Sequence, residues 1–133
     1  HGHALGFGSE ILLVADAVFS SPDAVFGFAE IDHGAAPSVA VTRGLDVMFR
    51  RRVLDLALTG RLFDVNTAIE ARLVHAISDN PIEAAEQAAI QMSAWSPDSV
   101  SLIKSLLGHG APDDHDRARN FMIPPLTQMK VAL

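Results

Sequence analysis

Strand signals in this chain are short and occur only in its first part. Residues 16–20, 24–27 and 74–77 are mostly apolar segments, and a Ser-Pro-Asp turn separates the first two. Beyond residue 78 the signals indicate helices alone. Because so few short strands cannot complete a sheet by themselves, the sequence predicts an α/β fold in which a segment outside these 133 residues supplies the rest of the sheet.

Helix signals divide the chain into two parts. The clearest one is Asn80-Pro81-Ile82-Glu83, which combines an N-cap residue, a first-turn proline and an N3 carboxylate. We therefore predict a mixed part over residues 1–78 and a helical part over residues 79–133. Helices are predicted at 38–43, 45–58, 68–73, 81–95, 97–108 and from Asp113 to Pro124. Gly60 is expected to end the second of these, and Asp64 or Asn66 to cap the third.

The chain opens with a glycine-rich loop that leads into a helix. Gly6 and Gly8 permit tight backbone geometry, and Ser9 and Glu10 suit the start of a helix. The spacing is not that of a dinucleotide fingerprint, and the Lys-Ser/Thr of a phosphate loop is missing. The unpaired N–H groups of such a turn can instead stabilise negative charge on a carbonyl oxygen.

Composition excludes several classes of protein. The chain has no cysteine, which rules out disulfides and thiolate chemistry. Its formal net charge of −6 argues against a nucleic-acid partner, and its longest apolar run, Ile11–Ala15, is far short of the ~20 residues of a membrane span. A mean hydropathy of +0.24 with 20% charged residues is apolar for a small free-standing domain. Part of the surface is therefore expected to meet another chain or segment.

The histidines do not form a metal-binding pattern. They are scattered, and no His/carboxylate set has closed ligand spacing, so we expect no metal. His33 lies three residues after Glu30 and is instead a candidate for lining a pocket. The histidines considered are His1, His3, His33, His109 and His115.

Two glutamates are the candidates for catalysis. Glu10 follows the glycine turn, and Glu30 follows a predicted strand in the apolar setting of residues 26–29. Two carboxylates that meet across a dry cleft can hold one water between them, one accepting its proton while the other donates. The alternative is a helix-start charge and an acid on a surface loop.

Five segments in order carry a family resemblance. They are residues 2–10 (GHALGFGSE), 24–30 (AVFGFAE), 34–37 (GAAP), 58–60 (LTG) and 71–74 (ARLV). They resemble the patterns G-x-A-L-G-G-G-x-E, F-G-x-P-E, G-x-x-P, L-T-G and G-L-V of the enoyl-CoA hydratase branch of the crotonase superfamily, and the similarity extends to about residue 107. The resemblance implies part of a crotonase-like ββα spiral core followed by a C-terminal helical region. In relatives these helices drive assembly into trimers, often dimers of trimers.

The resemblance also implies a site and a reaction. Glu10 matches the glutamate that acts as base, and Glu30 matches the one that protonates the α-carbon, when water adds to a trans-2-enoyl-CoA. The amide of Phe7 falls where the family places one of two oxyanion-hole donors. The CoA thioester is then the substrate, and no cofactor is needed. Further pocket-lining candidates are Gly6, Gly8, His33, Pro37 and Ser38.

Several alternatives stay open. Isomerases of this superfamily typically keep only the acid that matches Glu30, so the presence of both acids favours hydration, but an isomerase or a non-catalytic fragment or subunit is a rival reading. The family's N-terminal half supplies the other oxyanion donor and most CoA contacts, so it is expected in the same chain or in a partner. A cytoplasmic location is expected, with the mitochondrial matrix as the alternative.

The chain departs from the family pattern at four places. Phe7 replaces a glycine and is expected to narrow the acyl pocket, and Ala29 replaces the proline before Glu30. Residues 38–40 stand where relatives have a glycine-rich stretch. Arg72 replaces a helix-ending glycine, which costs about 1 kcal/mol in a left-handed conformation or shifts the helix end.

Overall fold

The structure is a computed structural model and describes residues 1–108. The chain divides into two compact units, His1–Ala89 and Ile90–Leu133. The candidate active site lies in the first unit. The helix predicted from Asp113, and with it His109 and His115, lies outside the described residues.

Two small sheets organise the first unit. In one, β3 (Val25–Gly27) pairs in parallel with β1 (His3–Leu5) and antiparallel with β4 (Phe63–Asp64). In the other, β2 (Phe19–Ser20) and β5 (Ala76–Ile77) pair in parallel. The strand order β1-β3-β4 puts β3, which leads toward Glu30, at the centre of its sheet.

The predicted strands are confirmed in shorter form, but β1 and β4 were not predicted. Local sequence favours a loop at β1, where a glycine lies on either side. Pairing overrides that preference, because Val25 N–H donates to Gly2 O (2.9 Å) and Gly6 N–H donates to Gly27 O (2.8 Å). These two segments are therefore strands because of their pairing with β3, not because of their local sequence.

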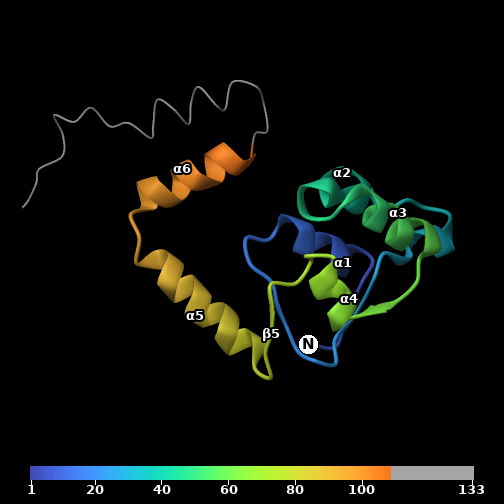
Figure 1. Ribbon diagram of the computed structural model, residues 1–133, viewed down its shortest axis with the longest axis horizontal. Coiled ribbons are helices and arrows are strands. Elements are labelled where there is room, and N and C mark those ends of the chain that lie inside the picture. Colours follow the sequence, from blue (N-terminus) through green and yellow to red (C-terminus); the bar gives the residue numbers. More distant parts are fainter. Residues whose placement is uncertain (109–133) are drawn as a thin grey trace, which may run out of the picture. The chain divides into compact units, whose positions relative to one another are not determined.

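The boundary predicted between helices 38–43 and 45–58 is wrong, because the first helix continues to Val47 and the second begins at Arg50. The chain turns extended at Met48 (φ −113°, ψ 154°) and Phe49 (φ −65°, ψ 144°), which splits it into two helices that pack together (Figure 1). Met48 is buried in the core at this break, and helical periodicity alone does not register a two-residue interruption. The helical segments of the first unit are α1 (Phe7–Glu10), η1 (Ile11–Val14), η2 (Ala29–His33), α2 (Ser38–Val47), α3 (Arg50–Thr59) and α4 (Val65–Glu70).

Predicted caps are confirmed at several helix ends. Asp64 Oδ1 accepts a hydrogen bond from Thr67 N–H (2.8 Å) at the start of α4, and this bond lowers the pKa of Asp64 below its ordinary value. Gly60 ends α3 with φ 61°. Asn80 and Glu83 bond reciprocally at the start of α5 (Pro81–Ser93), with Asn80 Nδ2 2.9 Å from Glu83 Oε2.

The last described helix, α6 (Pro97–Gly108), has the predicted bounds. Over residues 1–108, no helix has the length and apolar character that crossing a membrane requires.

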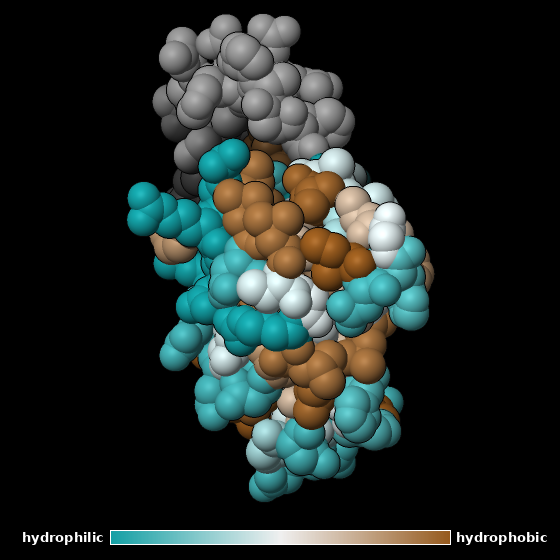
Figure 2. Space-filling view, turned by 90° about the vertical axis from the view of Figure 1, so that its right-hand side faces the viewer, coloured by the Kyte–Doolittle hydropathy of each residue, from teal (hydrophilic) through white to brown (hydrophobic). Residues whose placement is uncertain are grey.

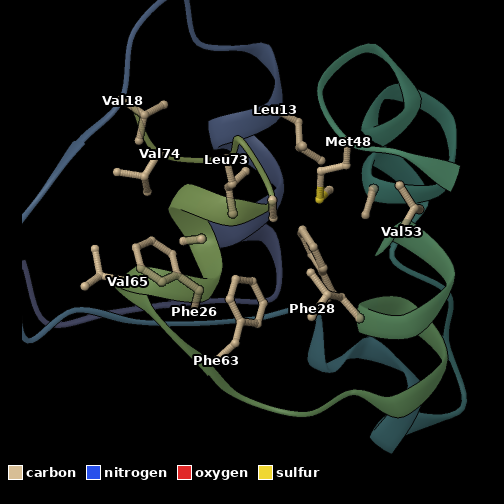
Figure 3. Close-up of a cluster of buried hydrophobic side chains, with 14 of the residues drawn as sticks. Leu13, Val18, Phe26, Phe28, Met48, Val53, Phe63, Val65, Leu73 and Val74 are labelled. Atoms are coloured by element: carbon tan, nitrogen blue, oxygen red, sulfur yellow. The ribbon is translucent and has the colours of Figure 1, made fainter. Parts of the chain in front are cut away.

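Aromatic side chains form the centre of the core (Figure 3). The rings of Phe26 and Phe63 stack with centroids 5.7 Å apart, and Phe28 lies 6.0 Å from Phe63. Phe28, Leu56 and Leu73 are fully buried. Since β3 and the residue that follows it contribute two of these rings, the backbone leading to Glu30 is anchored in the core.

Arg72 ends α4 in a left-handed conformation. It has φ 62° and is the one non-glycine residue with positive φ in the described range. Leu73 N–H donates to Ala68 O (2.9 Å), which closes the helix in the manner of a glycine cap. The positive φ is strained for an arginine in place of the family's glycine. The guanidinium of Arg72 lies 5.5 Å from the centre of the Phe49 ring, which is a favourable contact.

Strain at Arg72 predicts an unusual order of stability. Arg72→Gly and Arg72→Ala both remove the contact with Phe49, but only glycine adopts positive φ without cost, so the glycine variant is expected to be about 1 kcal/mol more stable than the alanine variant. Urea unfolding of both variants measures the difference. Equal stabilities would show that residue 72 carries no strain.

Candidate active site

Glu10 is buried and holds the start of a helix. Its side chain is on α1, where the residue is 4% exposed. The carboxylate oxygen Oε1 accepts hydrogen bonds from Val39 N–H (2.7 Å) and Ala40 N–H (2.8 Å) in the first turn of α2. The N-cap residue of α2 is Pro37, which has no side-chain acceptor. Glu10 therefore caps α2 from a distance, and one oxygen of its carboxylate is held in place.

Glu30 is partly buried on η2, and one of its carboxylate oxygens is unsatisfied. Oε2 is buried and has no hydrogen-bond partner in the part of the chain that the structure describes. Oε1 lies against Gly6, where an added Cβ would be only 3.3 Å from it. Glycine at position 6 thus gives the carboxylate room to reach this turn. A buried carboxylate oxygen without a donor is costly, so a water or a substrate is expected to bind there.

Gly6 is the point at which the two glutamates come near each other. Its carbonyl oxygen accepts the Glu10 N–H (3.0 Å), and the Glu30 carboxylate lies against its Cα. The backbone of Glu10 and the carboxylate of Glu30, 20 residues apart in sequence, thus meet at one turn. The Glu10 carboxylate is bonded to the first turn of α2, and a water held between the two carboxylates stays a prediction.

The amide of Phe7 is available as a donor. It begins α1, and within residues 1–108 neither it nor the amide of Gly8 donates to a protein acceptor. The Phe7 side chain is 68% exposed. Its ring therefore lies at the surface beside the turn, while its backbone N–H is free to bind an oxyanion.

The other predicted pocket residues differ in exposure. Gly8 has open space where a side chain would begin. His33 and Ser38 are exposed, whereas Pro37 is buried. No group of three or more His, Cys, Asp or Glu side chains suited to a metal occurs among the described residues.

Sequence reasoning missed two parts of the site. The first is the pair of amides at Val39 and Ala40 that hold Glu10. They lie in residues 38–40, where the chain departs from the family's glycine-rich pattern. That departure is the sequence feature from which a special role of this stretch could have been inferred. The second is Ser9, which is fully buried and bonded to two strands. Nothing in its local sequence distinguishes it from an ordinary helix-start serine.

Comparison with known proteins identifies similar hydratases. No protein-family model matches the chain. It is 31% identical over 113 residues to mevalonyl-coenzyme A hydratase of Aspergillus fumigatus, covering 83% of this chain and 42% of that protein. It is 32% identical over 110 residues to 2,3-dehydroadipyl-CoA hydratase of Escherichia coli, covering 80% of this chain and 43% of that protein. The chain thus spans about two fifths of the length of the curated relatives it matches.

Solved structures show the same fold. A structure described as an enoyl-CoA hydratase/isomerase from Acinetobacter baumannii superposes with a TM-score of 0.78 at 28% identity, covering 86% of this chain and 50% of that one. A structure described as an enoyl-CoA hydratase/carnithine racemase from Magnetospirillum magneticum gives a TM-score of 0.84 at 25% identity, covering 92% of this chain and 51% of that one. The fold is therefore the α/β crotonase fold, as predicted.

The sequence and structure comparisons agree with each other. The chain is similar to the C-terminal part of enoyl-CoA hydratases and of solved enoyl-CoA hydratase/isomerase structures of the crotonase fold.

Proposed function

We propose that this chain carries the acid and base of an enoyl-CoA hydratase, which converts a trans-2-enoyl-CoA into a 3-hydroxyacyl-CoA. The observation that carries the proposal is the environment of Gly6. There, the backbone N–H of Glu10 bonds to Gly6 O, Glu30 has an unsatisfied carboxylate oxygen beside the turn, and the Phe7 amide donates to no acceptor within residues 1–108. The carboxylate of Glu10 is held by two amides in the first turn of α2.

The proposed reaction uses each of these groups once. Glu10 enters as a carboxylate and accepts a proton from water as the water oxygen bonds to C3 of the enoyl group. Glu30 enters protonated and delivers its proton to C2. Proton exchange with solvent then removes the proton from Glu10 and returns one to Glu30. The electrons of the double bond move transiently onto the thioester oxygen, where the Phe7 N–H stabilises the charge. Acid, base and oxyanion donor suffice for this chemistry, so the proposal needs no cofactor or metal beyond the CoA thioester itself.

Relatives support the substrate class rather than a particular acyl group. The fungal and Escherichia coli relatives are named for two different acyl-CoA thioesters, mevalonyl-CoA and 2,3-dehydroadipyl-CoA. CoA is common to both names, so we propose an acyl-CoA substrate. The exposed ring of Phe7 at the site's turn favours an acyl pocket narrower than one bordered by glycine.

We also propose that the working site is completed by further protein. An N-terminal half, in the same chain or a partner, would supply the second oxyanion donor and CoA contacts, and the whole would assemble as a trimer or a dimer of trimers. Exposed apolar side chains support this proposal (Figure 2). On and between α2 and α3 they are Val41, Leu45, Phe49, Leu54 and Leu58. Large apolar side chains gathered at a surface are typical of a face that another protein covers.

An assay of the native assembly that contains this chain tests the proposal. We expect it to hydrate trans-2-enoyl-CoA thioesters. The reaction is monitored by the loss of the ultraviolet absorbance of the conjugated thioester, and the 3-hydroxy product is then identified. Conversion of a 3-enoyl thioester into a 2-enoyl thioester without hydration would favour an isomerase. Binding of thioesters without turnover would favour a non-catalytic subunit.

A further inference from the structure

Ser9 is a buried polar residue that connects two strands. Its side chain is fully buried. The hydroxyl donates its proton to Ala4 O in β1, and the same oxygen accepts the N–H of Gly27 at the end of β3 (3.1 Å). The Ala4 carbonyl oxygen can only accept a hydrogen bond, and the Gly27 N–H can only donate one. A side chain that bonds to the two of them must therefore donate and accept at the same time, as a hydroxyl does.

Gly27 is bonded to the glycine turn through both of its backbone groups. Its carbonyl oxygen accepts Gly6 N–H (2.8 Å), and its N–H donates to Ser9 Oγ (3.1 Å). We call this pair of bonds the Gly27 clasp. It joins the turn that ends at Glu10 to the strand that continues, within three residues, to Glu30.

We propose that Ser9 is a positioning residue that sets where Glu10 and Glu30 lie relative to each other. This inference rests on the proposed hydratase function, since it assigns a role within that site. Without the hydroxyl, the clasp loses one of its bonds and a buried N–H is left without an acceptor. The turn and β3 then move relative to each other, and the two carboxylates no longer hold one water in reactive geometry.

Three variants test the role of Ser9. Ser9→Ala removes the hydroxyl, and Ser9→Cys replaces it with a somewhat larger thiol that is only a weak hydrogen-bonding group. Ser20→Ala is the matched control, because Ser20 is also buried but, within residues 1–108, its hydroxyl donates only to the adjacent Ser21 O (3.1 Å). We expect kcat for enoyl-CoA hydration to fall about 10- to 100-fold in both Ser9 variants, because small misplacements of reacting groups have effects of this size. KM should stay nearly constant, and Ser20→Ala should keep the wild-type kcat.

A second measurement separates this proposal from the proposed function. Carboxyl carbon chemical shifts of Glu10 and Glu30 are recorded by NMR for the same variants. We expect both signals to move in Ser9→Ala and neither in Ser20→Ala. Wild-type protein that hydrates no enoyl thioester would overturn the proposed function alone. Unmoved carboxyl signals in Ser9→Ala, or a kcat loss as large in Ser20→Ala, would overturn the role of Ser9.

Discussion

Glu30→Gln is expected to lower kcat for enoyl-CoA hydration by about 10²- to 10⁴-fold, the usual contribution of a general acid or base. Glutamine has nearly the same shape and keeps an oxygen that can lie beside Gly6, but it has no proton to deliver to C2. Because the change affects the reacting carbon and not the CoA moiety, KM should remain nearly the same. Steady-state kinetics with a single enoyl thioester measures both parameters.

Glu70→Gln is the matched control for this prediction. Glu70 is exposed at the end of α4 and pairs with Arg52 at 3.5 Å, so its loss removes a surface ion pair and has little effect on stability. We expect wild-type kcat from this variant. A Glu30→Gln protein with full hydratase activity would rule out Glu30 as the proton donor.

Substitutions at Glu10 are expected to separate its chemical role from its structural role. Glu10→Ala leaves the N–H groups of Val39 and Ala40 without their acceptor, which should destabilise the fold by about 2–4 kcal/mol. Glu10→Gln keeps an oxygen that accepts both bonds. It should cost only about 1 kcal/mol, since hydrogen bonds to a neutral acceptor are about half as strong as those to a carboxylate.

Both Glu10 variants are expected to lose kcat to a similar extent despite their different stabilities. Neither alanine nor glutamine accepts a proton from water, so kcat should fall by about 10²- to 10⁴-fold in each. Urea unfolding and the enoyl-CoA assay are run on the same preparations. Activity retained in Glu10→Gln would assign Glu10 a purely structural role as the cap of α2.

Much of the local structure could be predicted from the sequence. Gly60 and the Asn80–Glu83 cap bound helices where predicted, because the energetics of capping lie within a few residues. Asp64 caps α4, which spans Val65–Glu70 and so begins three residues before the predicted range 68–73. The family resemblance was likewise readable, since it rests on short motifs in a fixed order. The assignment of Glu10 and Glu30 as catalytic residues stays a prediction for the experiments above.

Other features depended on contacts between distant segments. The break at Met48–Phe49 allows two helices to pack side by side, and β4 exists because it pairs with β3. The helix break depends on packing between two neighbouring helices and the strand on pairing between residues 25–26 and 63–64, and local propensity is too weak to decide such cases.

The amino-acid sequence alone established the residue types, their order and the caps, and through its motifs the resemblance to the superfamily. Only the folded chain shows that Glu10 binds the first amides of α2, that Glu30 keeps an unsatisfied oxygen beside Gly6, and that Ser9 joins β1 to β3. The physical reason is that hydrogen bonds and burial depend on distances in space, and pairs 18 to 30 residues apart are brought together by packing of the core.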